Sequence, residues 1–243
     1  MNSFRLALSI VPFDLKNVLR DELLYLIIAI TGVFLAAIAF VGLNADALGA
    51  AGLRPFMKYL TIFALMALPV NFGLVFGLLL IEETETGARA ALATTPAAPA
   101  VLALWRTPIA AFMVFALGWF YVLALNVAWN GPPLSLLQWG GVIVCAAALT
   151  PWVTLSLSTL ASTRIEALAL GKAYSAITGP PILLYLTPPD ALWRHLFFLF
   201  PTTPMLKAYD AFLAGADRAA VLWIAWGLAY AALLTFLAVL RMR

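Results

Sequence analysis

Residues 59–81 read YLTIFALMALPVNFGLVFGLLLI, a stretch that contains no acidic, basic or histidine residue. About 20 consecutive apolar residues in a helix cross the roughly 30 Å of hydrocarbon in a bilayer. A run of this length and composition therefore predicts a transmembrane helix. Lys58 precedes the run and Glu82 follows it, as expected where a chain leaves the membrane, because charge within the hydrocarbon is costly.

Five further stretches of similar length have the same character. Only the fifth stretch along the chain contains a charge, Lys172, which lies near one end where its long side chain can reach the interface. Aromatic residues gather near the ends of these stretches, as they do at membrane–water interfaces. The sequence therefore predicts six transmembrane helices, at residues 23–43, 59–81, 107–129, 139–161, 167–186 and 219–240.

The composition agrees with an integral membrane protein. The chain of 243 residues is 65% hydrophobic and 10% charged, with a mean hydropathy of +1.02, whereas a soluble domain carries about 25% charged residues. The net charge of +3 comes from basic residues spread over loops and ends, which fits topology signals better than a nucleic-acid surface. The single cysteine, Cys145, excludes an internal disulfide. We expect an all-α integral membrane protein with one domain over residues 1–243.

Six spans place both termini on one side of the membrane. The larger share of the 14 Lys and Arg residues falls on that side, and cytoplasmic loops are the ones enriched in these residues. The sequence therefore predicts cytoplasmic N- and C-termini.

Two further regions have helical periodicity without the length of a span. In residues 1–20, apolar side chains recur every three or four positions, which predicts an amphipathic helix lying in the interface; a disordered tail is the alternative. In the outer loop before the last span, two short amphipathic helices are predicted. The apolar positions are Phe4, Leu8, Val11, Leu15 and Val18 in the first region, and Leu196, Phe197, Phe200, Leu206, Tyr209 and Leu213 in the second.

Motifs for catalysis or nucleotide binding are not found in the sequence. Asp and Glu are absent from all six predicted spans, although ion-coupled transporters keep ionisable residues there. The chain has no HExxH zinc motif, no GxSxG nucleophile elbow and no GxxxxGK[ST] phosphate loop. We therefore expect neither an enzyme nor a chain that holds its own cofactor or metal, and energy for transport would enter through a partner.

Proline interrupts the second and fifth predicted spans. Pro69 and Asn71 lie midway in the second, and Gly179, Pro180 and Pro181 follow one another in the fifth. A proline within a helix frees a carbonyl and bends the axis. Such breaks are either packing features or hinges in two helices beside a translocation path, and the sequence leaves both open.

A cluster of carboxylates follows the second predicted span, where residues 81–96 read IEETETGARAALATTP. This pattern predicts an acidic turn leading into a helix parallel to the membrane, an element suited to contact a soluble partner. An ordinary charged boundary of a span is the alternative. The residues that carry the pattern are Glu82, Glu83, Glu85, Gly87, Arg89, Thr95 and Pro96.

The same stretch resembles the E-x-E-x-G-T-x-x-x-L-x-x-T-P region of ABC-2 type transporter permeases, with Ala88 in place of the threonine. Residues 161–172, ASTRIEALALGK, are similar to the A-S-N-R-x-E-G-x-A-x-x-K loop of that family. Thr163 and Ala167 depart from this second pattern. The layout of spans also resembles that of the family, most closely of bacterial drug-export permeases. The matching residues of the second loop include Arg164, Glu166 and Lys172.

The resemblance implies a function. Two permease subunits, identical or related, would form the pathway in the membrane, and two separate ATPase subunits would bind ATP and Mg below them. The segment 82–96 would couple to the ATPase, and the loop 164–172 would be a second cytoplasmic contact. An apolar or amphipathic drug or lipid-like substrate would be exported along the second and fifth spans. A membrane-embedded enzyme and a non-transporting anchor or assembly subunit are the alternatives.

Overall fold

The computed structural model describes residues 12, 16–44, 54–87, 99–129, 134–188 and 190–241. Every regular element in this part of the chain is a helix. The α-helices are α2 (Glu22–Leu43), α3 (Arg54–Glu85), α5 (Pro99–Trp129), α6 (Leu136–Leu160), α7 (Arg164–Thr178), α8 (Thr203–Leu213) and α9 (Asp217–Leu240). Two 3-10 helices, η2 (Pro180–Tyr185) and η3 (Leu192–Leu199), lie between α7 and α8.

Five of these helices, α2, α3, α5, α6 and α9, are long and apolar enough to cross a membrane. They contain the first, second, third and sixth predicted spans and all but the last residue of the fourth, so these five predictions are confirmed as helices. The helices α3 and α5 begin several residues before the predicted spans, and α3 also continues past its own to Glu85. Pro69 and Pro151 lie inside α3 and α6 without ending either helix.

The fifth predicted span is not one continuous helix. Helix α7 has 15 residues and ends at Thr178, and Gly179 caps it before η2 begins at Pro180. At 1.5 Å per residue, α7 covers about 22 Å, less than the hydrocarbon thickness. The two successive prolines explain the break, because neither can donate a backbone hydrogen bond to the preceding turn. A sixth membrane crossing by α7 and η2 together stays a prediction.

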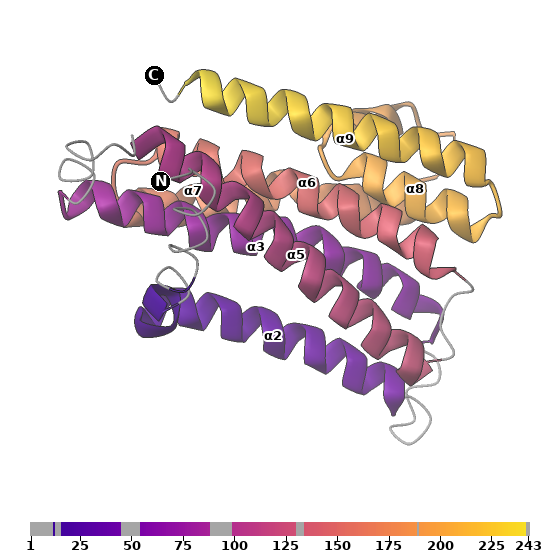
Figure 1. Cartoon of the computed structure of the whole chain (residues 1–243). Helices are drawn as coiled ribbons and strands as arrows, with labels where there is room; N and C mark the ends of the chain where they lie inside the picture. The colour runs from indigo at the N-terminus through magenta and orange to yellow at the C-terminus, as the bar shows by residue number, and fades with distance from the viewer. Residues whose placement is uncertain are drawn as a thin grey trace.

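Helix α3 is the centre of the bundle (Figure 1). In its apolar window 83% of the residues are buried, against 22% for α2 and 17% for α9, which lie on opposite flanks. Close packing between α3 and α6 depends on glycine, because a Cβ at Gly73 would lie 2.6 Å from Val153 Cβ. Small residues allow helix backbones to approach closely in this way inside membranes.

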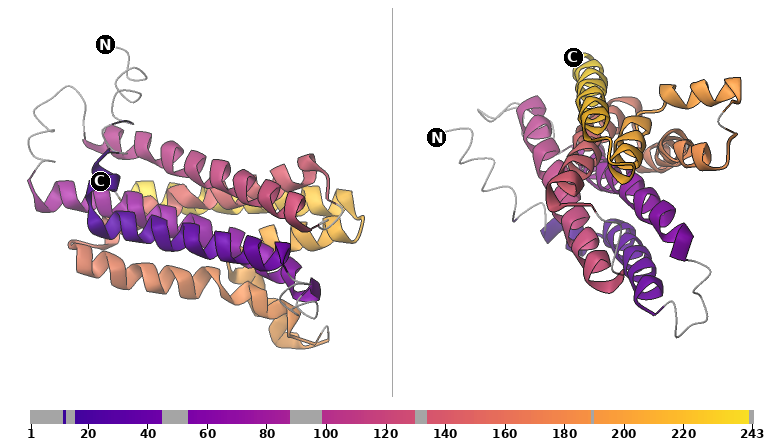
Figure 2. Two further views of the ribbon diagram at one scale, coloured as in Figure 1. Left: turned by 90° about the horizontal axis from the view of Figure 1, so that it is seen from below. Right: turned by 90° about the vertical axis from the view of Figure 1, so that its right-hand side faces the viewer.

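The connection before α9 packs at one end of the bundle, where Figure 2 shows η3 and α8 together. Most side chains of α8 are buried, since this helix packs against α6 and α9. Two short helices, η3 and α8, lie where two short amphipathic helices were predicted; their amphipathic character stays a prediction. Their expected place in the interface is not confirmed, because α8 is part of the core and only η3 carries a strongly exposed apolar face, with Leu196 and Leu199 on it.

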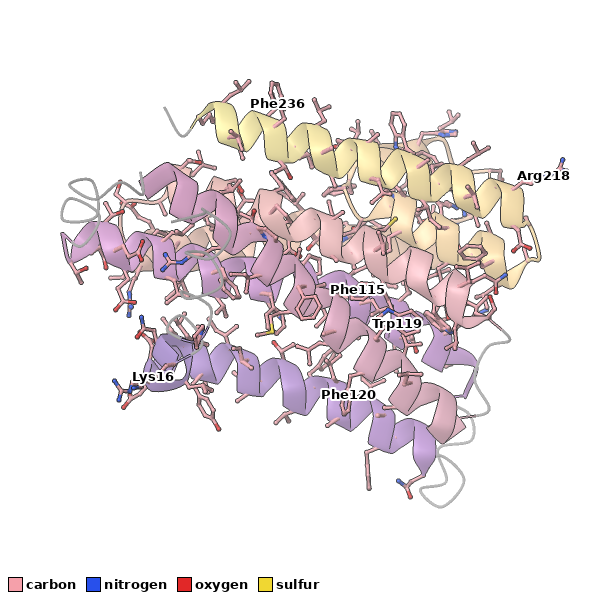
Figure 3. All side chains as sticks on the ribbon, viewed as in Figure 1. Lys16, Phe115, Trp119, Phe120, Arg218 and Phe236 are labelled. Carbon is pink, nitrogen blue, oxygen red and sulfur yellow. The ribbon has the colours of Figure 1, made fainter. Side chains whose placement is uncertain are left out.

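The predicted N-terminal interfacial helix lies largely outside the described residues. Residues 16–20 are helical and lead into α2 through a bend at Asp21. Lys16 marks this end of the bundle in Figure 3, and Arg218, at the start of α9, marks the opposite end.

Candidate functional site

An ion-pair cluster joins several helices at the end of the bundle where α2 and α7 begin and α3 ends. We use "ion-pair cluster" for Asp21, Glu82, Glu83, Arg106 and Arg164, and "ion-pair end" for this end of the bundle. The carboxylates on α3 lie in its last turn, so the predicted acidic turn is helical up to Glu85. The helix ends at Glu85, and two residues further Gly87 has a φ of 72°, in the left-handed region that favours glycine.

Arg164 is the centre of the cluster. Its Nη1 lies 2.9 Å from Asp21 Oδ2 and its Nη2 lies 2.6 Å from Glu82 Oε2. Its backbone N–H also donates to Glu85 Oε1 at 3.0 Å. One residue at the start of α7 thus binds the N-terminal end of α2 and the C-terminal end of α3.

Asp21 has a second role as the N-cap of α2. Its Oδ1 accepts hydrogen bonds from the backbone N–H groups of Leu23 and Leu24, each at 3.0 Å, while Oδ2 binds Arg164. Partial burial raises the pKa of this carboxyl, but the hydrogen bonds from Leu24 and Leu23 and the charge of Arg164 outweigh that effect and lower the pKa below its usual value. The contacts of Asp21 with α2 and α7 therefore favour the ionised form of this carboxyl in the folded protein.

A second ion pair joins α3 to α5. Arg106 Nη2 lies 2.7 Å from Glu83 Oε1, and the Arg106 side chain is only 6% exposed. A buried guanidinium is retained only where carboxylates or carbonyls satisfy it. Glu83 and Arg106 therefore fix the start of the apolar part of α5 to the end of α3.

The second predicted contact loop is rigid at its first residues. Thr163 caps α7 by accepting a hydrogen bond from the Glu166 N–H at 3.3 Å, and Glu166 Oε2 accepts one from the Ser162 N–H at 2.7 Å. The second bond reaches the residue before the N-cap, so it differs from a capping box, in which the N-cap N–H itself is the donor. Lys172 is exposed and lies two turns further along α7, away from the cluster.

The structure brings together only part of the predicted contact residues. Glu82 and Glu85 each bind Arg164 directly. Glu83 binds Arg106 instead, and Lys172 is separate from both groups. Arg89, Thr95 and Pro96 lie outside the described residues, so their arrangement stays a prediction.

Sequence reasoning missed Asp21 and Arg106 as members of the cluster. Each lies at the start of a predicted span, where a charge has an ordinary explanation as a boundary residue. Opposite charges at the ends of neighbouring spans could have identified these two residues. This inference requires knowing which helix ends lie next to one another in the bundle.

The predicted pathway residues also lie near one another. A cavity of about 140 Å³ between α3 and α7 is lined by Asn71 and Gly179 together with Val70 and Thr178. Asn71 Nδ2 donates to Thr31 Oγ1 on α2 at 2.9 Å, so this polar side chain has a partner within the bundle. A hinge role for Pro69 remains a prediction, because α3 continues through it.

The fold and the site define a class of protein. Five long apolar helices form a multi-pass membrane protein, and ion pairs at one end link three of them, α2, α3 and α5, with α7. In the described ranges no group of His, Cys, Asp or Glu residues could hold a metal ion.

The chain belongs to the family described as "Fluoroquinolones export permease protein Rv2686c-like", whose family model matches residues 14–239. This is a family of ABC-2 type drug-export permeases, which confirms the resemblance drawn from the two loops. No curated protein and no solved structure matches the chain.

Proposed function

We propose that the chain is the membrane-spanning subunit of an ATP-binding-cassette exporter, in which separate ATPase subunits hydrolyse ATP and a second permease subunit completes the pathway. Membership in an export permease family supports this function. In this proposal the ion-pair end faces the cytoplasm of a bacterial inner membrane, and the segment 82–96 meets the ATPase.

The observation that carries the proposal is the position of Arg164. Because its guanidinium binds Asp21 and Glu82 at once, a displacement of the tip of α3 moves the start of α2 and the start of α7 with it. A partner that pushes on this tip would therefore shift three helices together, which is the rigid-body motion that a transport cycle needs.

The ion pairs also change the role expected for the carboxylates. Glu82, Glu83 and Glu85 bind groups of the permease itself, so we assign them to holding the contact surface in shape rather than to pairing with the ATPase. The surface left for a partner includes Ile165, which is 80% exposed at the same end.

The substrate in this proposal is an amphipathic drug, because the family is described as one of fluoroquinolone export permeases. The cavity between α3 and α7 supports a path there, because its wall combines apolar side chains with Asn71 and the break at Gly179. A pocket of this mixed character suits a ligand that is largely apolar with few polar groups.

Reconstitution tests the function. The tagged chain is expected to co-purify with an ATPase subunit, and vesicles that contain both are expected to accumulate a fluoroquinolone only when ATP is supplied. Arg164→Gln should abolish most of the transport while the ATPase still binds, and Arg218→Gln at the opposite end should leave transport unchanged. ATP-dependent transport at the wild-type rate by an Arg164→Gln and Glu82→Gln double variant would contradict the coupling role.

The orientation has its own test. Cys145 is the single cysteine and is buried, so a Cys145→Ala chain provides a background for labelling. Thr84→Cys, on the exposed side of the α3 tip, should react with an impermeant maleimide only from the cytoplasmic side of the membrane. Labelling from outside the cell would show that this loop is not cytoplasmic, and the proposed contact between the loop and the ATPase would be wrong.

A further inference from the structure

A second cavity, of about 180 Å³, lies at the ion-pair end between α6, α7 and α9, away from the α3–α7 cavity. The α9 part of its lining is Leu234, Leu237, Ala238 and Arg241. These residues are spaced by three or four positions, so they form one face of the helix. The cavity is open at its side, and a volume on the order of 150 Å³ is enough to admit a benzene-sized group.

Polar and apolar groups are separated along this groove. Arg241 directly follows the last residue of α9. Among the residues that line the groove, Arg241 is the one that carries a charge. From Arg241 to Leu234 the groove runs about 10 Å along the helix axis, and Leu237 is 49% exposed beside it. Phe236, on the same turn of α9, points away from the bundle in Figure 3, so this flank of the helix faces the surroundings of the bundle.

The inner wall of the groove is a fixed polar unit. The Tyr174 hydroxyl donates to Ser156 Oγ at 2.5 Å, and Ser156 Oγ donates to the Trp152 carbonyl at 2.5 Å. The Tyr174 ring packs edge-on against Trp152 with centroids 5.0 Å apart. This wall joins α7 to α6, and a molecule in the groove would touch both helices and α9.

We propose that this groove binds an anionic phospholipid of the membrane leaflet at the ion-pair end, with the phosphate at Arg241 and the start of one acyl chain along Leu237 and Leu234. The charge fits, because the groove has a cation and no carboxylate among its lining residues. Basic pockets between transmembrane helices are known to bind anionic head groups. The C-terminal ends of α6 and α9 carry partial negative charge here, so an anion needs the guanidinium in order to bind.

The test uses the full chain, stripped of lipid in a neutral detergent. Phosphatidylglycerol with brominated acyl chains is titrated, and quenching of Trp152 is taken as the difference between the wild type and Trp152→Phe. We expect half-maximal quenching at a mole fraction at least tenfold lower than for brominated phosphatidylcholine. Native mass spectrometry of retained phosphatidylglycerol gives a second measurement that does not need the Trp152→Phe variant to fold.

Matched variants decide the role of the charge. Arg241→Gln should raise the mole fraction needed for phosphatidylglycerol at least tenfold, to that of phosphatidylcholine, whereas Arg241→Lys and Arg218→Gln should retain the preference. Equal quenching by both lipids in the wild type would overturn the proposal, as would the same loss in Arg218→Gln.

Two competitors distinguish the source of the anion. Inorganic phosphate at millimolar concentration should not displace the lipid, and displacement would show a site for free anions instead. A fluoroquinolone should also leave the quenching unchanged, and displacement would assign the groove to the transported drug. The readout involves neither ATP hydrolysis nor transport. The lipid proposal can therefore fail while the proposed exporter function holds, and the reverse is also possible.

Discussion

Arg164 Nη2 lies 2.6 Å from Glu82 Oε2 while Nη1 of the same guanidinium lies 2.9 Å from Asp21 Oδ2. The two carboxylates are far apart in the sequence and belong to different helices. Partial burial lowers the pKa of Arg164, and Asp21 and Glu82 more than offset this and raise it. The guanidinium therefore stays charged and acts as a permanent link between α2, α3 and α7.

Replacing this link should cost a modest amount of stability. The Arg164 side chain is 28% exposed and that of Glu82 40% exposed, and partly exposed ion pairs contribute up to about 1 kcal/mol each. Arg164→Gln should therefore lower the free energy of unfolding by about 1–2 kcal/mol, measured by denaturant titration in mixed micelles. Lys172→Gln removes an exposed cation from the same helix and should change it by less than about 0.5 kcal/mol. An equal effect of the two substitutions would show that the link is not specific.

Glu83 should matter more than Glu85, although the two are neighbours on α3. Glu83 binds the buried Arg106 at 2.7 Å, and hydrogen bonds to charged groups contribute about 1.5–3 kcal/mol. Glu85 is exposed and accepts from the backbone of Arg164. We expect Glu83→Gln to destabilise the fold by about 2 kcal/mol and Glu85→Gln by less than about 1 kcal/mol. Thermal unfolding followed by circular dichroism ranks the two variants, and the reverse order would contradict the buried pair.

The Asp21 carboxyl gives stability that depends on pH. Its pKa is lower in the folded protein than the usual value of 3.8, so the folded state favours the ionised form. The stabilisation is therefore fully present above about pH 4 and is lost as the pH falls through the lower folded value. The difference in unfolding temperature between the wild type and Asp21→Asn should be constant from pH 7 to pH 5 and shrink below pH 4. A difference that grows on acidification would reverse the assigned sign.

Gly73 and Gly32 provide a matched test of helix packing. A Cβ at Gly73 would lie 2.6 Å from Val153, while at Gly32 nothing lies within 4 Å. Overpacking of a close contact costs about 1–3 kcal/mol, so Gly73→Ala should destabilise the bundle by that amount. Gly32→Ala should be neutral or stabilise by up to about 1 kcal/mol, because alanine favours the helix. If the two variants have the same free energy of unfolding within error, Gly73 does not lie at a close contact between α3 and α6.

Hydropathy was enough to predict most of the fold. Five long uncharged runs became five long helices, because the length of the hydrocarbon sets a signal that tertiary packing does not alter. The fifth span shows the limit of this reasoning. Gly179, Pro180 and Pro181 were recognised as an interruption, but hydropathy sums over a window and does not register that two prolines end a helix.

The candidate site was predicted less completely. The loop motifs identified Glu82, Glu83, Glu85 and Arg164, but they did not show that Glu82 and Glu85 bind Arg164 or that Glu83 binds Arg106. Contacts between helix ends depend on which helices are neighbours, and the sequence of a single chain does not supply that. Asp21 was missed for this reason, since it belongs to no motif and only its position opposite Arg164 makes it part of the ion-pair cluster.

Helix α3 has 32 residues, about 48 Å of axis, and contacts α2, α5, α6 and α7 along its sides. Such a rod is longer than the lipid core that it crosses, and its surplus carries the carboxylates at the tip. We expect a load applied at that tip to be shared among these four neighbours, because α3 packs against each of them. We therefore expect the stiffness of this permease to come from α3, the most buried of its five long helices. The outer helices packed against α3 are expected to move with it.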